Sequence, residues 1–493
     1  MQNFSKTRLI SMLICPRRFW LELYKPDLRK DSQQTNTNYS IGYQVGEIAR
    51  IIFDPNATGT LIDIEKEGFD NALLKSKLLL KRDLPIFEAG FLGSNIIAFA
   101  DVMLPIKNKT AWQMIEVKSS TAIKNYHKDD IAIQTFAAKA AGIEIEKVCI
   151  AHIDRSWTYS GNREYEGLLK IHDLSDEAFA RNNEVADWVN QAISIANSNL
   201  EPNKSIGEQC QIPFDCGFIS HCSKEQRTAE FPIKWLPRIT SKKLLEFQSD
   251  GIHDLRMVPD EKLNNIQLRV KNTSITGDTY FDKQGCHKEL QKYPLPCHFL
   301  DFESIQFGVP IWKDTKPYQQ VCFQFSLHTL KENGQLMHSE FIDLSGEDPN
   351  KKFAQALISK CGNDSNTIFV YNSSFEKSRI AELAQKFPDL AAILNEINNR
   401  IVDLLPIAKS YFYHPSQEGS WSIKKLLRVI DPDNSYDSLD GVKDGNMAID
   451  AYREAINEKT LQERKNELKN QLLKYCHLDT LALFKLWEKF KSI

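Results

Sequence analysis

The sequence has no apolar run of about 18 residues or more, which excludes the usual membrane-spanning helix. Its first residues also lack the apolar core of a secretory signal, so we expect a cytoplasmic protein with no membrane partner. Basic residues are not in excess, because 62 Lys and Arg face 65 Asp and Glu, for a net charge of −3. This balance lacks the compositional sign of a nucleic-acid-binding protein but leaves room for a local basic groove.

Cysteines are few and mostly scattered. Six of the ten follow no ligand spacing, and we interpret them as reduced, buried thiols: Cys149, Cys286, Cys297, Cys322, Cys361 and Cys476. Cys210, Cys216 and Cys222 instead recur with five residues between them, in a segment predicted to be a loop. In a chain without a secretory signal, this pattern favours a soft metal or an iron–sulfur cluster over disulfides, and a zinc site stays open. A cluster usually takes four ligands, and Cys15 is the best fourth candidate.

Charged residues interrupt strands that otherwise look buried. Residues 87–91 and 95–104 are predicted to form a hairpin, and 111–118 a third strand. Asp101 interrupts the second of these strands, and Glu116 and Lys118 share one face at the end of the third. Such charges are costly in a core unless they are paired or bound to metal. An aspartate and a glutamate can hold Mg²⁺ or Mn²⁺, and a lysine beside them can orient or deprotonate a water.

Helices are predicted before and after these strands in the sequence. A helix over 41–53 carries Glu47, and a helix over 129–141 carries Gln134 and precedes a strand at 147–153. This order resembles the RecB-family PD-(D/E)XK nucleases that carry an iron–sulfur cluster, a group that includes the CRISPR-associated adaptation exonuclease and the AddB type. The resemblance covers residues 1–225 and predicts that they form one domain.

The resemblance implies roles for the residues of its motifs. The implied set is Asp101 and Glu116 as metal ligands, Lys118 as the catalytic lysine, Gln134 as the glutamine motif, and Cys15, Cys210, Cys216 and Cys222 as the ligands of a [4Fe–4S] cluster. The sequence departs from the family in three places. Glu47 stands where many relatives have a histidine ligand, Ala138 stands where a tyrosine usually follows the glutamine, and the first gap between the late cysteines is longer.

Residues 226–292 are predicted to be a helical linker. Short amphipathic helices over 239–247 and 260–270 are separated by Gly251 and Pro259. They faintly resemble helix-hairpin-helix repeats, which grip phosphate backbones, and a purely structural linker is the alternative.

From residue 295 the composition changes to that of a new α/β domain, which carries a second set of acids. Asp301 and Glu303 lie two apart on a predicted strand over 296–303 and therefore share a face. Further strands are expected at 320–328, 340–343 and 367–371, and the last leads into a helix that carries Glu376. On a late leucine-rich helix, Tyr475 and Asp479 are one turn apart. Four acids from such elements are what a two-metal phosphodiesterase needs.

This set resembles the DEDD exonucleases of the ribonuclease H-like fold, over residues 293–493. The resemblance implies Asp301, Glu303, Glu376 and Asp479 as metal ligands, Tyr475 as the residue that positions the attacking water, and Asp403 in support. Glu376 departs from the family, which generally has aspartate there. The region also resembles an uncharacterised domain that is fused to RecB-like modules in bacterial proteins.

Together these patterns predict an α/β protein with two nuclease modules that act with Mg²⁺ or Mn²⁺ on nucleic acid. We expect the substrate to be single-stranded or end-bearing DNA, contacted by basic and aromatic residues such as Arg17, Arg18, Trp20 and Lys124. An RNA-processing exonuclease is one alternative. A nucleic-acid-binding protein with one or both modules inactive is another, which the departures at Glu376 and Ala138 favour. His414 and His477 are left without a role.

Overall fold

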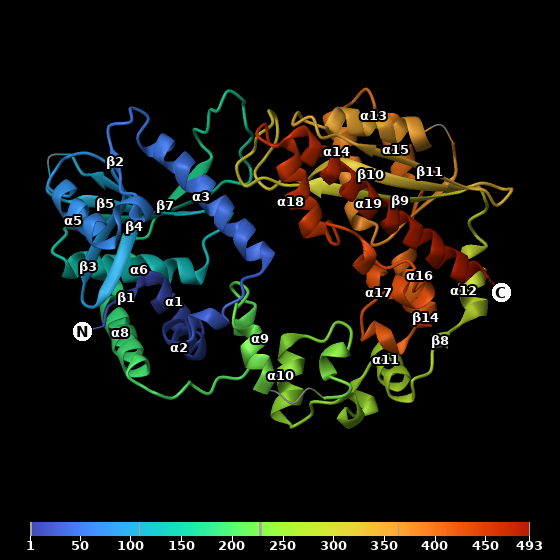
Figure 1. Cartoon of the computed structure of the whole chain (residues 1–493), viewed down its shortest axis with the longest axis horizontal. Coiled ribbons are helices and arrows are strands. Elements are labelled where there is room, and N and C mark those ends of the chain that lie inside the picture. Colours follow the sequence, from blue (N-terminus) through green and yellow to red (C-terminus); the bar gives the residue numbers. More distant parts are fainter. Residues whose placement is uncertain (1, 108, 226–228, 363, 493) are drawn as a thin grey trace. The chain divides into compact units, whose positions relative to one another are not determined.

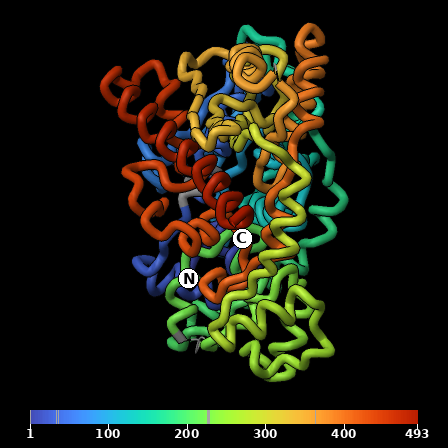
Figure 2. Tube along the Cα trace, turned by 90° about the vertical axis from the view of Figure 1, so that its right-hand side faces the viewer, coloured from blue at the N-terminus to red at the C-terminus, as the bar shows by residue number. Residues whose placement is uncertain are grey.

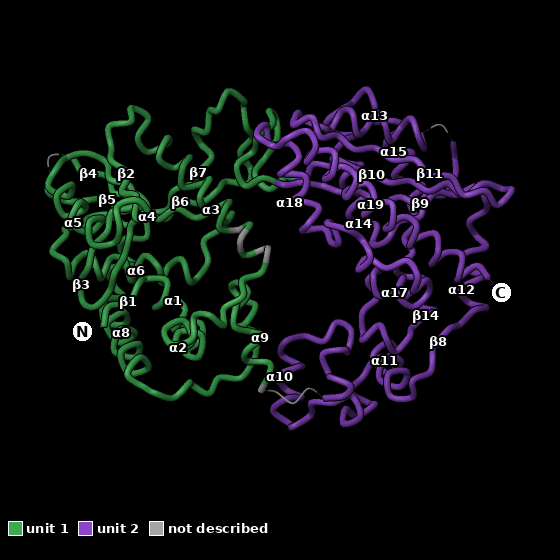
Figure 3. The backbone as a smooth tube through the Cα atoms, viewed as in Figure 1, with its two compact units in different colours: residues 1–227, 307–319 green, residues 228–306, 320–493 purple. Residues whose placement is uncertain are grey.

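The computed structural model describes residues 2–107, 109–225, 229–362 and 364–492. It is an α/β protein with mixed sheets, divided into two compact units that Figure 3 shows in green and purple. The first unit comprises residues 1–227 and 307–319, and the second comprises 228–306 and 320–493. None of the helices that the structure describes is both long and apolar enough to cross a membrane.

The first unit is built on one mixed sheet with the strand order β2-β3-β4-β5-β6-β7, which β1 joins beside β4. Strands β3, β4 and β5 form an antiparallel meander, and β5 pairs in parallel with β6 through the intervening helix α6. The strands are β1 (Phe4–Ser5), β2 (Thr60–Leu61), β3 (Ile86–Gly93), β4 (Ile96–Pro105), β5 (Trp112–Lys118), β6 (Ile145–Ile153) and β7 (Leu169–Asp173).

Helices cover this sheet. They are α1 (Lys6–Ile14), α2 (Pro16–Tyr24), α3 (Gln33–Phe53), α4 (Ile64–Glu67), α5 (Phe69–Leu79), α6 (Asn125–Ala140), α7 (Ser175–Ala180), α8 (Asn182–Ala196) and α9 (Ile219–Cys222). The buried face of α6 includes Ile131 and Ile133, which pack in one core with Ala98 and Met114 of the sheet. This side of the sheet positions the first candidate site, because α6 lies against the strands that carry its acids (Figure 1).

The second unit is built on a five-stranded sheet with the order β11-β10-β9-β12-β13. Strand β10 is antiparallel to both of its neighbours, and β12 and β13 run parallel to β9. The strands are β9 (Cys297–Ile305), β10 (Val321–Leu330), β11 (Leu336–Ile342), β12 (Thr367–Val370) and β13 (Ile401–Asp403), and a separate pair joins β8 (Tyr280–Phe281) to β14 (Phe412–Tyr413).

Two helical layers enclose this sheet. The helices of the unit are α10 (Ser241–Ser249), α11 (Asn265–Thr276), α12 (Lys283–Leu290), α13 (Asn350–Cys361), α14 (Ser374–Lys386), α15 (Ala391–Asn399), α16 (Leu404–Tyr411), α17 (Ile423–Ile430), α18 (Gly445–Ile456) and α19 (Gln462–Lys491). On one face Leu300 and Phe302 of β9 pack against α13, α14 and α15. On the other, Phe299 packs against Phe484 and Trp487 of α19, the long red helix of Figures 1 and 2.

The units divide the chain differently from the predicted domains. Residues 229–292, expected to be a separate linker, belong to the second unit, where Val270 and Leu290 are fully buried in its core. Residues 307–319, which follow β9, belong to the first unit. There the hydroxyl of Tyr318 donates a hydrogen bond of 2.5 Å to the carbonyl of Ser119, directly after Lys118. Sequence reasoning could not place this segment, because its contacts are far away in the chain.

Candidate active sites

Glu116 is the centre of a buried polar cluster in the first unit. Its carboxylate is 3% exposed and accepts hydrogen bonds from Lys118 at 2.5 Å, from Lys6 at 2.9 Å and from Gln134 at 2.6 Å. Lys118 comes from the same strand, Gln134 from α6 and Lys6 from the start of α1. The structure therefore brings Glu116, Lys118 and Gln134 together.

Two members of this cluster were missed in the sequence. Asp130 accepts a hydrogen bond of 2.5 Å from Lys118 and one of 3.0 Å from Gln134, and it lies 3.5 Å from Lys6. Asp130 and Gln134 are one turn apart on α6, so helical spacing was a signal that could have found the aspartate. Lys6 had no comparable signal, because it precedes the strands by about a hundred residues and reaches them only in the folded chain.

Asp101 joins the cluster through an irregularity of the sheet. Its carboxylate accepts a hydrogen bond of 2.6 Å from the backbone N–H of Val117. Ala100 packs in the core shared with α6, whereas Val102 packs in the core on the other face, although side chains two apart normally share a face. Opposite Asp101, Glu88 has a φ of 57°. This local break in the strand pair lets Asp101 turn toward the end of β5, as irregularities of this kind do near active sites.

The electrostatics of the cluster depend on its two lysines. Burial, with the charges of Asp101 and Asp130 added, raises the pKa of Glu116 to about 7. Burial acts in the same direction on Asp130, but the ammonium groups of Lys118 and Lys6 outweigh it and hold the pKa of Asp130 well below its usual range. Burial opposes the charge of both lysines as well, yet the nearby carboxylates raise the pKa of each. Lys6 and Lys118 are thus protonated at neutral pH.

Glu47 lies outside this cluster. It is on α3, its side chain is 49% exposed, and its carboxylate lies 3.8 Å from Arg50. No hydrogen bond among the described residues joins it to Asp101 or Glu116, so the structure does not place it as their third metal ligand. A half-buried acid does lie near Asp101, because Glu88 faces it across the strand pair and desolvation raises the pKa of Glu88.

A cavity of about 510 Å³ opens beside the cluster. Basic and aromatic side chains dominate its lining, which includes Lys6, Arg18, Arg29, Lys118, Lys124, Tyr39, Tyr126, Phe214 and Tyr318. Arg18 and Lys124, which were predicted to contact nucleic acid, are part of this lining. Arg17 and Trp20 are not, since Arg17 pairs with Glu201 at 2.6 Å and the indole of Trp20 donates to the carbonyl of Ser198.

The four predicted cluster cysteines also gather in the first unit. Burial is the largest cause that raises the pKa of the Cys222 thiol to about 11. The nearby thiols of Cys216, Cys15 and Cys210 act in the same direction. All four cysteines are among the described residues, and no three of their sulfur atoms lie within 4.8 Å of one another. Phe214, between Cys210 and Cys216, lines the cavity described above, with the Arg18 guanidinium 4.9 Å from its ring centre.

The second unit holds the tighter group of acids. One carboxylate oxygen each from Asp301, Glu303 and Asp479 lies within 4.8 Å of the others. Asp301 and Glu303 share the face of β9 that α19 covers, and Asp479 comes from α19 itself. Leucines on α19, such as Leu472 and Leu486, bury the helix and fix its rotation, which turns Asp479 toward the strand.

Two tyrosines and a lysine surround Asp479. The hydroxyl of Tyr436 donates a hydrogen bond of 2.6 Å to the Asp479 carboxylate. The ring of Tyr475 lies 6.0 Å from that of Tyr436, and the ammonium of Lys424 lies about 5 Å from both ring centres. Tyr436 and Lys424 were missed in the sequence, because the segment between Asp403 and Tyr475 has no motif that points to a particular acid.

Glu376 and Asp403 have different environments. Glu376 is 3% exposed, and its Oε2 atom has no hydrogen-bond partner among the described residues. Asp403 instead accepts hydrogen bonds of 2.9 to 3.0 Å from three backbone N–H groups, those of Asn372, Ser373 and Leu405. It therefore holds the turn before α14 and caps α16, and this position is a supporting one.

Burial, together with repulsion between the carboxylates, raises the pKa values of these acids. Burial, followed by the charges of Asp479 and Glu303, raises the pKa of Asp301 well above its ordinary value. Burial and then Asp479 do the same for the pKa of Glu303. Burial raises the pKa of Glu376 to about 7 and that of Asp479 to about 6. The site thus concentrates buried negative charge with little compensation from the chain's own cations.

Replacing Asp403 should separate a supporting role from a ligand role. We expect Asp403→Ala to lower the free energy of unfolding of the second unit by about 2–3 kcal/mol, because it leaves three backbone N–H groups without an acceptor. Asp403→Asn should lose about half of that, since its remaining carbonyl oxygen can still accept from Asn372 and Leu405. Urea denaturation of both variants measures the difference, and equal losses would contradict this account.

The known proteins that this chain resembles have no stated activity. A domain of unknown function, DUF2779, matches residues 298–422. The chain is 23% identical to Uncharacterized protein MG366 of Mycoplasma genitalium over 209 residues, which are 38% of this chain and 31% of that protein. It is 27% identical to the MG366 homolog of Mycoplasma pneumoniae over 210 residues, 38% of this chain and 30% of that protein. The chain thus spans about a third of these relatives, and no solved structure matches it significantly.

Proposed function

We propose that the protein is a metal-dependent nuclease with a phosphodiesterase centre in each unit. The observation that carries this proposal is the group formed by Asp301, Glu303 and Asp479 in the second unit, where three carboxylate oxygens lie within 4.8 Å of one another. Buried carboxylates this close repel one another, and a divalent cation is the ordinary way in which such a group is stabilised.

The donor set of the second unit suits Mg²⁺ or Mn²⁺. All of its donors are carboxylate oxygens, which these cations prefer, and the unpartnered Oε2 of Glu376 is a further buried oxygen donor nearby. When bound, two such ions would stabilise the attacking and leaving oxygens of a phosphodiester. Among the chain's own residues, Tyr436 orients Asp479 by hydrogen bonding, and Tyr475 is the candidate for positioning the water.

The topology of the second unit supports the same assignment. A central strand with antiparallel neighbours on one side and parallel strands on the other is the order expected of a ribonuclease H-like sheet. Asp301 and Glu303 lie on that central strand, Glu376 lies at the helix after the next strand, and Asp479 lies on the last helix. This distribution agrees with the DEDD pattern that the sequence suggested.

The first unit supports a second centre. A meander that leads through a crossover helix to a parallel strand is the order expected of a PD-(D/E)XK core, with Asp101, Glu116 and Lys118 on the meander. In this centre Lys118 would orient the water or balance phosphate charge, and Gln134 would hold Glu116. The basic and aromatic lining of the adjacent cavity suits a single strand, whose phosphates and bases need cations and flat rings.

The cysteines suit an iron–sulfur cluster better than one zinc ion. A tetrahedral zinc with bonds of about 2.3 Å holds its sulfurs roughly 3.8 Å apart, whereas no three of these four sulfurs lie within 4.8 Å of one another. Cys15 is the N-cap of α2, and the other three cysteines lie at 210–222, up to the end of α9, so a cluster would join the two ends of the unit's main segment. Its contribution would be structural, since no step of hydrolysis needs an electron.

Cleavage of end-labelled oligonucleotides tests the proposed activity. We expect anaerobically purified protein to degrade single-stranded DNA with Mg²⁺ or Mn²⁺ and to be inactive in EDTA. RNA of the same sequence serves as the competing substrate, and preferential loss of RNA would favour the RNA-processing alternative. If neither polymer is cut by protein with its full cluster content, the nuclease proposal is wrong and binding without catalysis is left.

Removal of one cluster ligand should affect one unit only. We expect Cys15→Ala to lower the melting temperature of the first unit and its absorbance at about 400 nm. The reason is that the loss of a ligand releases a cofactor that joins distant segments. Cys149→Ala is the matched control, because Cys149 is also a buried cysteine of this unit but lies in β6. A zinc content of about one per chain without visible absorbance would contradict the iron–sulfur assignment.

A further inference from the structure

Three histidines of the second unit meet where α19 crosses the β10–β11 hairpin. His328 and His338 are direct partners in the antiparallel register, and His477 comes from α19. The ring centres of these three residues are 4.3 to 4.8 Å apart. One ring nitrogen from each lies within 4.8 Å of the other two, so three potential ligand atoms converge.

Hydroxyl groups form hydrogen bonds with one nitrogen of two of these rings. Nδ1 of His328 lies 2.8 Å from the Thr480 hydroxyl, and Nε2 of His338 lies 2.9 Å from the Ser326 hydroxyl. The two hydroxyls are 2.7 Å apart, and Thr480 donates to the carbonyl of His477. Every donor has an acceptor if each of the two rings donates to its hydroxyl and Ser326 donates to Thr480.

This hydrogen-bond order prepares the rings as ligands. It leaves Nε2 of His328 and Nδ1 of His338 without a proton, and so with a lone pair. An outer hydrogen bond that fixes the tautomer is the usual support of a metal-binding histidine.

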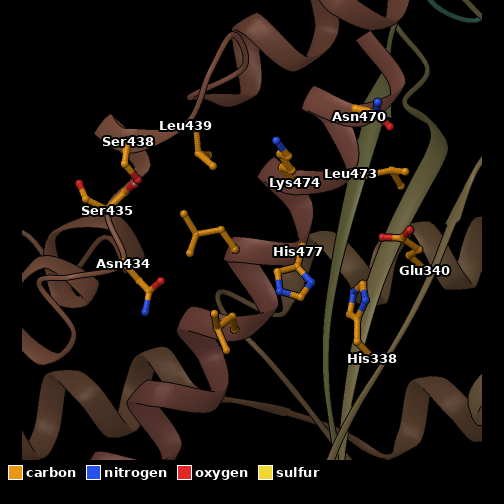
Figure 4. Close-up of a pocket in the computed structure, with 12 residues that line it drawn as sticks. His338, Glu340, Asn434, Ser435, Ser438, Leu439, Asn470, Leu473, Lys474 and His477 are labelled. Atoms are coloured by element: carbon orange, nitrogen blue, oxygen red, sulfur yellow. The ribbon is translucent and has the colours of Figure 1, made fainter. Parts of the chain in front are cut away.

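The site faces a cavity of about 560 Å³. His338 and His477 are part of its lining, and Figure 4 shows their rings next to each other. Glu340, two residues after His338 on the same strand, and Lys474 on α19 also line it. Three protein ligands beside open space leave room for a fourth, exchangeable ligand.

We propose that His328, His338 and His477 bind a transition-metal ion of the Zn²⁺ class, with its fourth coordination position open to this cavity. Imidazole suits zinc, copper and nickel, whereas Mg²⁺ prefers oxygen, so this site and the carboxylate group select different ions. Three histidines with an open position are also the ligand set of catalytic rather than structural zinc. Water from the cavity is the fourth ligand that this arrangement makes accessible.

The ion would also fix the helix that carries part of the carboxylate group. His477 and Asp479 are both on α19, and Ser326 is the register partner of Asp301. A metal held by the hairpin and by α19 therefore constrains Asp479 relative to β9. The inference does not rest on nuclease activity, because the histidines would bind the ion whether or not the carboxylates support hydrolysis.

Zinc titration of the full-length, cluster-loaded protein tests the site. Isothermal titration with Zn²⁺ is performed in a large excess of Mg²⁺, which occupies carboxylate sites. We expect His338→Ala to weaken Zn²⁺ binding at least about a hundredfold, since one of three ligands is lost. His253→Ala is the matched control, because His253 is an exposed histidine of the same unit, and it should bind like the wild type.

Two further measurements guard against a folding defect. Ser326→Ala keeps all three histidines and should weaken Zn²⁺ binding about ten- to a hundredfold by releasing the His338 ring. Co²⁺ should give wild-type protein a visible spectrum typical of tetrahedral coordination, beyond the bands of the iron–sulfur cluster, and His338→Ala should lack it. Equal Zn²⁺ affinity in wild type and His338→Ala, at matched melting temperatures, would overturn the proposal.

Discussion

Asp301→Asn should abolish cleavage by the second unit and at the same time make the metal-free protein more stable. Asp301 is one of three carboxylates within 4.8 Å, and it lies on the central strand of the sheet. Loss of one of the carboxylates that would hold the metal should remove about 4 kcal/mol of transition-state stabilisation, which is about a thousandfold in rate. Cleavage is measured in a Lys118→Ala background, so that the first unit does not contribute.

The stability change has the opposite sign from that of most buried substitutions. In metal-free protein the Asp301 carboxyl must either keep its proton or carry a charge in a buried place that Asp479, Glu303 and Glu376 make unfavourable, and an amide avoids both costs. In EDTA we therefore expect a higher melting temperature for Asp301→Asn than for the wild type. Saturating Mn²⁺ should reverse the order, because only the wild type gains the binding free energy, about 2.7 kcal/mol at a hundred times Kd.

Asp433→Asn is the control for this experiment. Asp433 is an exposed aspartate of the same unit outside the carboxylate group, so its replacement should change neither rate nor melting temperature. If Asp301→Asn loses activity but also melts lower than the wild type in EDTA, the residue holds the fold together and the metal-ligand role is wrong.

The raised pKa values of these buried acids predict how metal binding depends on pH. Asp479 has a folded pKa of about 6 and Glu376 one of about 7, both raised by burial above their ordinary values. A carboxyl group with a raised folded pKa keeps its proton where the unfolded chain has already lost its own, so metal-free protein should lose stability as pH rises from about 4 to 7. Mn²⁺ affinity should increase over the upper part of this range, because binding must displace these protons.

Local patterns were enough to predict the elements that carry the acids. The runs at 95–104 and 111–118 are β4 and β5, and the run at 296–303 lies within β9, because apolar alternation fixes strands when one face is buried. The division into units was beyond such patterns. The placement of 307–319 in the first unit depends on contacts such as that of Tyr318 with Ser119, which no local property of the segment predicts.

The sites show the same limit. Glu116, Lys118 and Gln134 were predicted from motifs, yet Asp130 and Lys6, which bind them, follow no motif of their own. The resemblance to a family also favoured Glu47, a position that the fold leaves half exposed on α3. The histidine group was missed for a physical reason, because His328 and His338 become neighbours only through strand register and His477 only through helix packing.

Lys118→Ala should abolish cleavage by the first unit, measured in an Asp301→Asn background. Its ammonium lies 2.5 Å from both Glu116 and Asp130, at the mouth of the basic cavity. A protonated lysine that orients the attacking water and stabilises the charge developing on the phosphate contributes about a hundred- to a thousandfold in rate. The second unit should keep its rate when Lys118→Ala is made alone, since the two centres lie in different units.

A comparison of Lys6→Ala with Lys118→Ala tests whether Lys118 takes part in the reaction or only balances charge. Both ammonium groups pair with Glu116 and approach Asp130, but only Lys118 belongs to the Glu-x-Lys pair. If charge balance were its whole role, Lys6→Ala and Lys118→Ala would lower rate and stability alike. We expect both to lower the melting temperature, because each leaves buried carboxylates short of a partner, and only Lys118→Ala to lose cleavage in folded protein. Lys128→Ala, which removes only a pairing with Glu177, should change neither property.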